Sequence, residues 1–186
     1  MNLFRSTTTT PITTNSINRS PLRRGFLLIP LLFGCLALAP TPKAFGVSPA
    51  PDGGYANGNT AEGTQALQSL TTGAFNTANG VVALFHNTGG NYNGATGAGA
   101  LYSNTTGNAN TANGVVALYS NTTGAFNTAN GVVALFSNTM GANNTADGAA
   151  ALYSNTTIGA NSGSDNTAVG FGALALNSTG VNNTAT

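Results

Sequence analysis

Few side chains in this sequence could serve as a nucleophile, a general base or a metal ligand. From Val47 onward the ionisable side chains are one histidine and four carboxylates: His86, Asp52, Glu62, Asp147 and Asp165. A hydrolase needs a nucleophile beside a positioned base. His86 takes a place that most repeats of the chain fill with serine, so we interpret it as a surface residue. Clustered metal ligands are also missing from the pattern. We therefore expect no catalytic residue, no cofactor and no metal site.

Charge is divided unevenly along the chain. All five Lys and Arg residues lie in the first 46 positions, so the four acidic residues leave the remainder with a formal charge of −4. Nucleic-acid binding requires cations that displace counterions from phosphate, and anionic lipid surfaces attract basic segments for a related reason. The region from residue 47 onward is therefore not expected to bind nucleic acid.

Residues 1–46 have the organisation of a secretory signal peptide. Residues 26–39 form a 14-residue apolar stretch, expected to be the signal helix, behind Arg23 and Arg24, and Ala44 and Gly46 precede a cleavage site before Val47. The stretch is shorter than the roughly 20 apolar residues that a membrane span needs. We predict a secreted chain, at the outer membrane or outside the cell, with no integral membrane domain after cleavage.

Two details of export stay open. Arg23 and Arg24 are similar to a twin-arginine signal, whereas the strongly apolar core favours the general secretory route. Residues 32–35, Leu-Phe-Gly-Cys, are similar to a lipoprotein box, but Phe33 is bulky and the apolar run continues past Cys35. A lipoprotein is the less favoured alternative.

A 17-residue unit then recurs through residues 59–186, after a lead-in at residues 47–58 whose Pro and Gly predict flexibility. Its pattern is Asn-Thr-Ala-x-Gly-x-x-Ala-Leu-(Phe/Tyr)-x-Asn-Thr-Thr-Gly-x-x. The eight copies start at Asn59, Asn76, Asn93, Asn110, Asn127, Asn144, Asn166 and Asn183, and the last is incomplete at Thr186. A short fixed period predicts stacked units that bury apolar surface against their neighbours. The extra residues at 158–165 are expected to loop out of one corner without disturbing the register.

Seventeen residues suit one coil of an all-β solenoid, because helical repeats need roughly 33 residues or more. We predict two strands of about five residues and two turns per coil. In the first strand, Thr-Ala-x-Gly, alternation places Ala and Gly inside a thin coil whose opposite backbones approach closely, and Thr and the variable residue outside. The second strand, such as residues 115–119, is apolar throughout, which predicts that both of its faces are covered.

Asparagine and glycine recur where each coil must turn, for example at Asn104 and Gly107. Both residue types tolerate left-handed backbone conformations, and stacked asparagine side chains can hydrogen-bond from one coil to the next. We expect both features here.

Leucine and aromatic residues occupy neighbouring positions of the second segment in successive copies. Because adjacent strand residues point to opposite sides, we assign the leucines to the interior and the aromatic residues to an intersubunit surface. The predicted self-association row is Phe85, Tyr102, Tyr119, Phe136 and Tyr153. A homotrimer is expected; the alternative is a monomer whose aromatic ladder is half exposed.

The segment Asn166-Thr167-Ala168-Val169-Gly170 and its siblings resemble the Ser-Val-Ala-Ile-Gly type repeats of trimeric autotransporter adhesin heads. The whole unit is more similar still to the Asn-Thr-Ala-x-Gly arrays of bacterial surface and tail-fibre-like proteins. The resemblance covers residues 59–186 and implies a left-handed β-roll, usually trimeric, displayed at the cell surface. This chain differs from adhesin heads in its 17-residue period, since those heads usually repeat at 14 residues. No binding residue can be transferred from the family to this chain.

These features together predict a secreted, non-enzymatic surface protein: a repeat rod for adhesion to a matrix or surface ligand, or for fibre formation. The alternative is an ice-binding β-solenoid. It depends on a threonine row expected along one face, namely Thr60, Thr77, Thr111, Thr128, Thr145, Thr167 and Thr184. Threonine is also a good outward strand residue in general.

Overall fold

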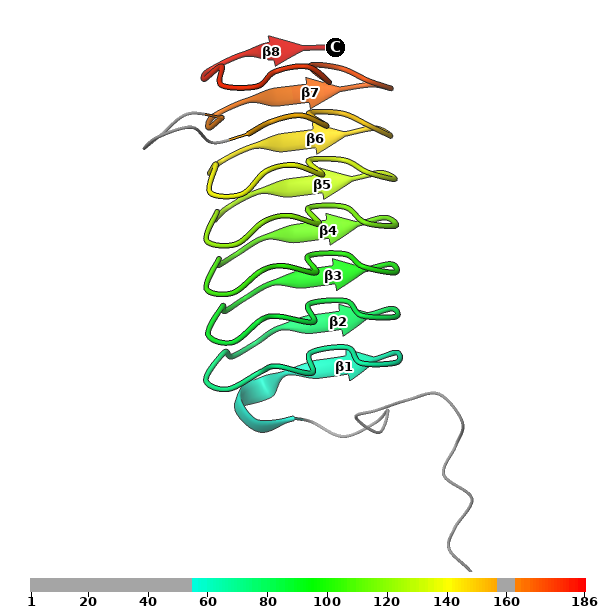
Figure 1. The fold of residues 1–186 in the computed structure, drawn as a ribbon, viewed down its shortest axis with the longest axis vertical. Helices are drawn as coiled ribbons and strands as arrows, with labels where there is room; N and C mark the ends of the chain where they lie inside the picture. Colours follow the sequence, from blue (N-terminus) through cyan, green and yellow to red (C-terminus); the bar gives the residue numbers. More distant parts are fainter. Residues whose placement is uncertain (1–54, 157–162) are drawn as a thin grey trace, which may run out of the picture. The chain divides into compact units, whose positions relative to one another are not determined.

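The repeat array forms a parallel β-solenoid of about seven turns in a computed structural model that describes residues 55–156 and 163–186 (Figure 1). Each coil contributes one short strand: β1 (Thr60–Glu62), β2 (Thr77–Asn79), β3 (Gly94–Thr96), β4 (Thr111–Asn113), β5 (Thr128–Asn130), β6 (Thr145–Asp147), β7 (Thr167–Val169) and β8 (Thr184–Ala185). The predicted signal peptide and most of the lead-in lie outside the described residues.

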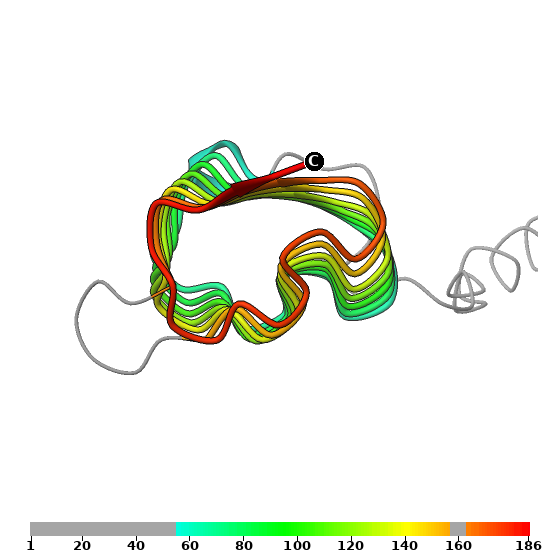
Figure 2. The same cartoon turned by 90° about the horizontal axis from the view of Figure 1, so that it is seen from above.

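All eight strands form one parallel sheet in sequence order. Equivalent repeat positions pair throughout; Ala112 on β4, for example, lies between Ala95 and Ala129. The register survives the 22-residue step, since Thr145 pairs with Thr167, as predicted. Residues 157–162 of that insertion lie outside the described residues. Seen from the C-terminal end, the coils superimpose and the chain runs clockwise as it rises toward the viewer, so the solenoid is left-handed (Figure 2).

The strands alternate as the sequence predicts. In β2 and β4 the central alanine is buried and its two neighbours are exposed. The glycines that follow these strands have positive φ. They lie close to the backbone of the neighbouring coil, and not to the opposite backbone of their own coil. A Cβ on Gly80 would lie 2.5 Å from the carbonyl oxygen of Gly97. The glycines therefore allow neighbouring coils to approach each other, whereas we expected contact across the coil.

The predicted second strand is wrong. Residues 81–86 and their equivalents form turns, with positive φ at alternate residues such as Val82 and Leu84. Hydrogen bonds then leave this segment in both directions, from the Val82 N–H to the Thr64 carbonyl in the preceding coil and from the Leu84 N–H to the Ala100 carbonyl in the next. Ala83 and Leu84 are adjacent and both buried. A strand cannot turn two adjacent side chains to one side, so a continuous apolar run here indicates a turn.

The core is narrow and built from small side chains. Each coil contributes two alanines and one leucine, and Leu84, Leu101, Leu118, Leu135 and Leu152 are all fully buried. The leucines lie inside the solenoid, as predicted. This core stacks along the axis, so each coil buries its apolar face against the coils on either side.

Two columns of asparagine, buried except at their partly buried C-terminal members Asn177 and Asn183, run beside the apolar core. The first Asn column comprises the residues that start each copy, from Asn59 to Asn183. The second comprises Asn87, Asn104, Asn121, Asn138, Asn155 and Asn177. The Asn110 Nδ2 donates to Asn93 Oδ1 (3.1 Å) and to the Gly124 carbonyl (2.8 Å). Asn121 Nδ2 donates to Asn104 Oδ1 and to the same Gly124 carbonyl. The predicted coil-to-coil amide ladder is confirmed, and no buried side-chain polar atom among the described residues lacks a partner.

The predicted left-handed conformation of these turn residues is wrong. Neither Asn104 nor Gly107 has positive φ. A Cβ on Gly107 would instead collide with Asn104 Oδ1 and with the Gly124 carbonyl. Glycine is required at this position because the Asn columns occupy the space of a side chain.

The N-terminal end of the solenoid is covered by residues that the sequence assigns to the flexible lead-in. Tyr55 bridges to Asn59, and η1 (Ala56–Gly58) forms a short 3-10 turn beneath β1 (Figure 1). Tyr55 and Leu70 pack against the buried core. Leu70 replaces the asparagine that later coils have in the second Asn column, so the column gives way to an apolar residue in the first coil.

Candidate interaction surfaces

The predicted self-association row forms a continuous aromatic ladder outside the leucine core. Ring centroids of successive members lie 4.9–5.4 Å apart with interplanar angles of 3–14°. Four of the rings are half-buried, and Tyr153 is exposed. Stacked aromatic pairs at such separations contribute beyond their buried area, by about 0.5–1.5 kcal/mol each. The faces of these rings are thus occupied by one another, and their edges face outward.

Valines extend this ladder into a wider apolar surface. A Cβ on Gly99, which takes the repeat position of Val82 and Val116, would lie 3.0 Å from Val116 Cγ1 and 3.5 Å from the Tyr119 ring. A side chain at this position therefore borders both the valine and the aromatic ring of the next coil. We call the aromatic row together with Val82, Val116 and Val133 the apolar strip. The preceding valines, Val81, Val115 and Val132, are 49–52% exposed. The structure therefore leaves an apolar surface uncovered, although its backbone is not the double-sided strand that we expected.

His86 lies at the surface, as predicted. Its ring is exposed and makes edge-on contacts with Phe85 (4.7 Å) and Tyr102 (4.9 Å). Asp165 accepts a hydrogen bond from Asn143 Nδ2 at 3.0 Å, and Asp147 points outward from β6. Among the described residues, no three His, Cys, Asp or Glu side chains gather where they could hold a metal ion.

The outer face of the sheet carries two parallel columns of side chains. The threonine column follows the first residue of each strand and is interrupted only by Gly94. The variable column follows the third residue: Glu62, Asn79, Thr96, Asn113, Asn130, Asp147 and Val169. Neighbours in a column are separated by about 4.8 Å along the axis, and the two columns by about 6.6 Å along the strands. The face is therefore a regular array of hydroxyl and amide groups with two carboxylates.

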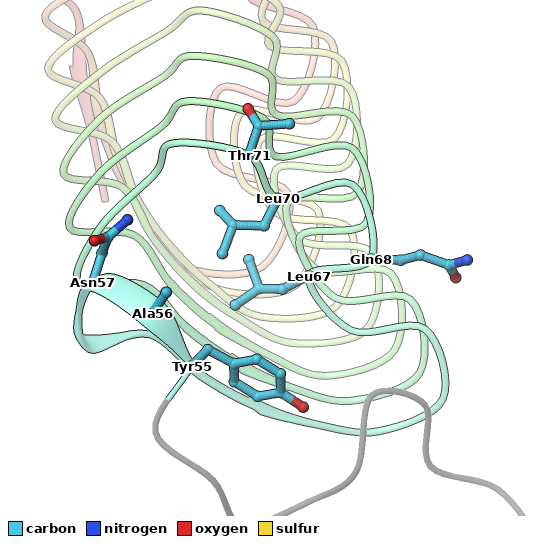
Figure 3. Close-up of a pocket in the computed structure, with 7 residues that line it drawn as sticks. All are labelled: Tyr55, Ala56, Asn57, Leu67, Gln68, Leu70 and Thr71. Carbon is cyan, nitrogen blue, oxygen red and sulfur yellow. The ribbon is translucent and has the colours of Figure 1, made fainter.

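A cavity of about 390 Å³ opens at the N-terminal end of the solenoid. Leu67 and Leu70 point into it from the first coil, Tyr55 lies beneath them, and Gln68 points away from the coil (Figure 3). We assign no ligand to this cavity, because it adjoins the first described residue of the chain.

A second group of exposed aromatic side chains was not singled out from the sequence. Phe75, Tyr92 and Phe126 occupy the last position of their repeats and are 57%, 64% and 65% exposed. Phe75 and Tyr92 stack with centroids 5.1 Å apart. Their shared position in the 17-residue unit could have revealed this second column from the sequence. The pattern is interrupted, however, because Ala109, Asn143 and Asp165 occupy the same position in other copies.

No protein-family model, curated protein or solved structure matches this chain. Among the described residues, no helix is long and apolar enough to span a membrane.

Proposed function

We propose that this chain is a secreted, non-enzymatic surface protein whose rod self-associates through the apolar strip and presents its sheet face for adhesion or fibre building. The observation that carries the proposal is the division of the solenoid surface into an apolar strip and an array of Thr and Asn side chains. Contiguous exposed apolar surface on a soluble protein marks an interaction site. The resemblance to adhesin heads supports a trimer as the assembly.

The sheet face suits many weak contacts better than one strong contact. Its hydroxyl and amide groups repeat at every coil, so a repetitive ligand could engage several of them together, and avidity would replace single-site affinity. The composition supports a binding role as well, since no cationic side chain follows Lys43 to stabilise a developing anion.

Sedimentation of the purified chain tests self-association. We expect an oligomer at micromolar concentration, and we expect the double variant Tyr119→Ser with Phe136→Ser to sediment as a smaller species, because it removes two adjacent rungs of the ladder. Phe75→Ser with Phe126→Ser is the matched control, since it removes two aromatic side chains elsewhere on the surface and should leave the oligomer intact. A wild-type chain that is monomeric under these conditions would refute the assembly.

Ice binding is the second candidate. The observation that favours it is the threonine column, in which the side chains of successive coils lie in register on an outward face. The asparagines of the variable column, which lie beside the threonines, fit an adhesive or structural face as well as an ice-binding one. Asn113 Nδ2, for example, donates to Asn130 Oδ1 at 3.0 Å. Thermal hysteresis separates the two candidates.

A further inference from the structure

The second aromatic column has a missing rung. Tyr92 and Phe126 lie two coils apart at the same repeat position, and Ala109 occupies the coil between them. Coils rise by about 4.8 Å each, so the two rings are about 9.6 Å apart along the axis. One flat ring between them would lie about 5 Å from each, which is within the stacking range of aromatic centroids. The stacked pair Phe75 and Tyr92 shows the same step, at 5.1 Å.

The backbone holds the walls and the floor of this slot in register. Tyr92, Ala109 and Phe126 share one conformation, with φ between 52° and 58°. Their N–H groups donate to the preceding coil in the same way, to the carbonyls of Ala74 (3.0 Å), Asn91 (2.9 Å) and Asn108 (3.0 Å). The Ala109 methyl group therefore occupies the root of a rung whose ring is absent. Tyr92 and Phe126 are correspondingly more exposed than the half-buried rings within the continuous ladder.

The residue that precedes Ala109 carries a free hydrogen-bond donor. The Asn91 amide uses both of its hydrogens, on the Gly89 carbonyl and on Asn108 Oδ1, each at 3.0 Å. The Asn108 amide donates only to the Thr106 carbonyl, at 2.9 Å. The next coil has Ala125 where an amide acceptor would continue the series, so the second hydrogen of Asn108 Nδ2 has no partner among the residues that the structure describes.

We propose that this slot binds one sugar ring of a glycan. A pyranose presents flat C–H faces that pack on aromatic rings and hydroxyl groups at its rim that accept a hydrogen bond. The slot offers two aromatic walls, the side-chain Nδ2 donor of Asn108 and the phenol of Tyr92 in an uncharged setting. An apolar aromatic ring of a partner protein would fill the same space but would offer the Asn108 Nδ2 no acceptor. The assignment names a ligand class for the proposed adhesive role and does not require self-association.

The test uses the purified chain and proton NMR with the methyl glycosides of glucose, galactose and mannose as probes. Stacking between two rings should shift the pyranose C–H signals upfield, with a millimolar dissociation constant for at least one sugar. Ala109→Phe supplies the missing rung and should weaken binding at least about tenfold. The backbone at this position already accepts Phe in two other coils, so the fold should persist. Phe126→Ser, at an exposed site, should weaken binding by removing one wall.

Asn143→Phe is the matched control, because it extends the same column beyond Phe126 and leaves the slot open; binding should be unchanged. The proposal is overturned if no methyl glycoside shifts at tens of millimolar, or if Ala109→Phe binds as the wild type does. Phenol that binds the slot where no glycoside does would also overturn it, in favour of an aromatic side chain of a protein partner. Ala109→Phe should leave the sedimentation profile unchanged, so failure here is distinguishable from failure of the proposed assembly.

Discussion

At the scale of single residues, the two Asn columns explain how a chain so rich in polar side chains forms a stable interior. A buried amide without a partner costs free energy, whereas a fully bonded one is tolerated. Each asparagine between the two ends of the first column bonds to the coil before it and the coil after it, so the 17-residue spacing is specified by polar contacts as well as by the leucines. A slip in register would break every amide bond along the column.

Asn110→Ala should destabilise the solenoid by about 3 kcal/mol, because it leaves the Asn127 backbone and side-chain N–H groups without the oxygen that accepts them at 3.0 and 3.1 Å. Urea unfolding followed by circular dichroism measures the change. Asn113→Ala is the matched control in the same coil. This side chain is exposed and makes one amide bond, so its loss should cost about 0.5 kcal/mol or less. Equal costs for the two variants would contradict the structural role of the column.

At the scale of one coil, two glycines that look alike in sequence have opposite consequences. Gly107→Ala should strongly destabilise the chain, by more than about 3 kcal/mol, because its methyl group would collide with a backbone carbonyl and a buried amide. Gly94→Thr should be neutral or stabilising by about 0.5–1 kcal/mol, since no atom lies within 4 Å of a Cβ there and the strand would gain a residue that favours β structure. Thermal unfolding midpoints compare the pair, and the reverse order would show that the coil spacing differs from the one described.

The coil also shows where reasoning from sequence succeeds and where it fails. The period and the inward Ala and Leu follow from the repeat, and so do the outward Thr and the amide ladder, because side-chain chemistry alone requires them. The prediction of a second strand was wrong at Leu84 and its equivalents, where a non-glycine residue adopts positive φ at a cost of about 1–2 kcal/mol. Only burial between coils and the inter-coil hydrogen bonds can offset that cost, and both are properties of the stack. The slot at Ala109 was missed for a similar reason, since an absent ring has no signature in a single copy.

At the scale of the whole molecule, the solenoid separates surfaces that a globular domain would mix. The threonine column, the apolar strip and the second aromatic column each run along the axis because each is built from fixed positions of the repeat. Changing a column therefore alters one surface without touching the others. The assembly and the ligand contacts that we propose can be tested independently for this reason.

The sheet face permits the final test, which separates adhesion from ice binding. We expect the chain to show no thermal hysteresis, because the threonine column lies beside a variable column that carries two carboxylates, an exposed valine and amides bonded to each other. Ice binding predicts a different thermal hysteresis for the wild type and for two variants. The wild type would show hysteresis, Thr111→Tyr with Thr128→Tyr would abolish it by adding bulk in the middle of the face, and Gly94→Thr would increase it by completing the column. The Tyr119→Ser and Phe136→Ser double variant would keep its hysteresis, since its changes lie on another surface. That set of outcomes would replace the adhesive assignment with ice binding, whereas ordinary freezing in the wild type and in Gly94→Thr leaves adhesion or fibre building as the role of this face.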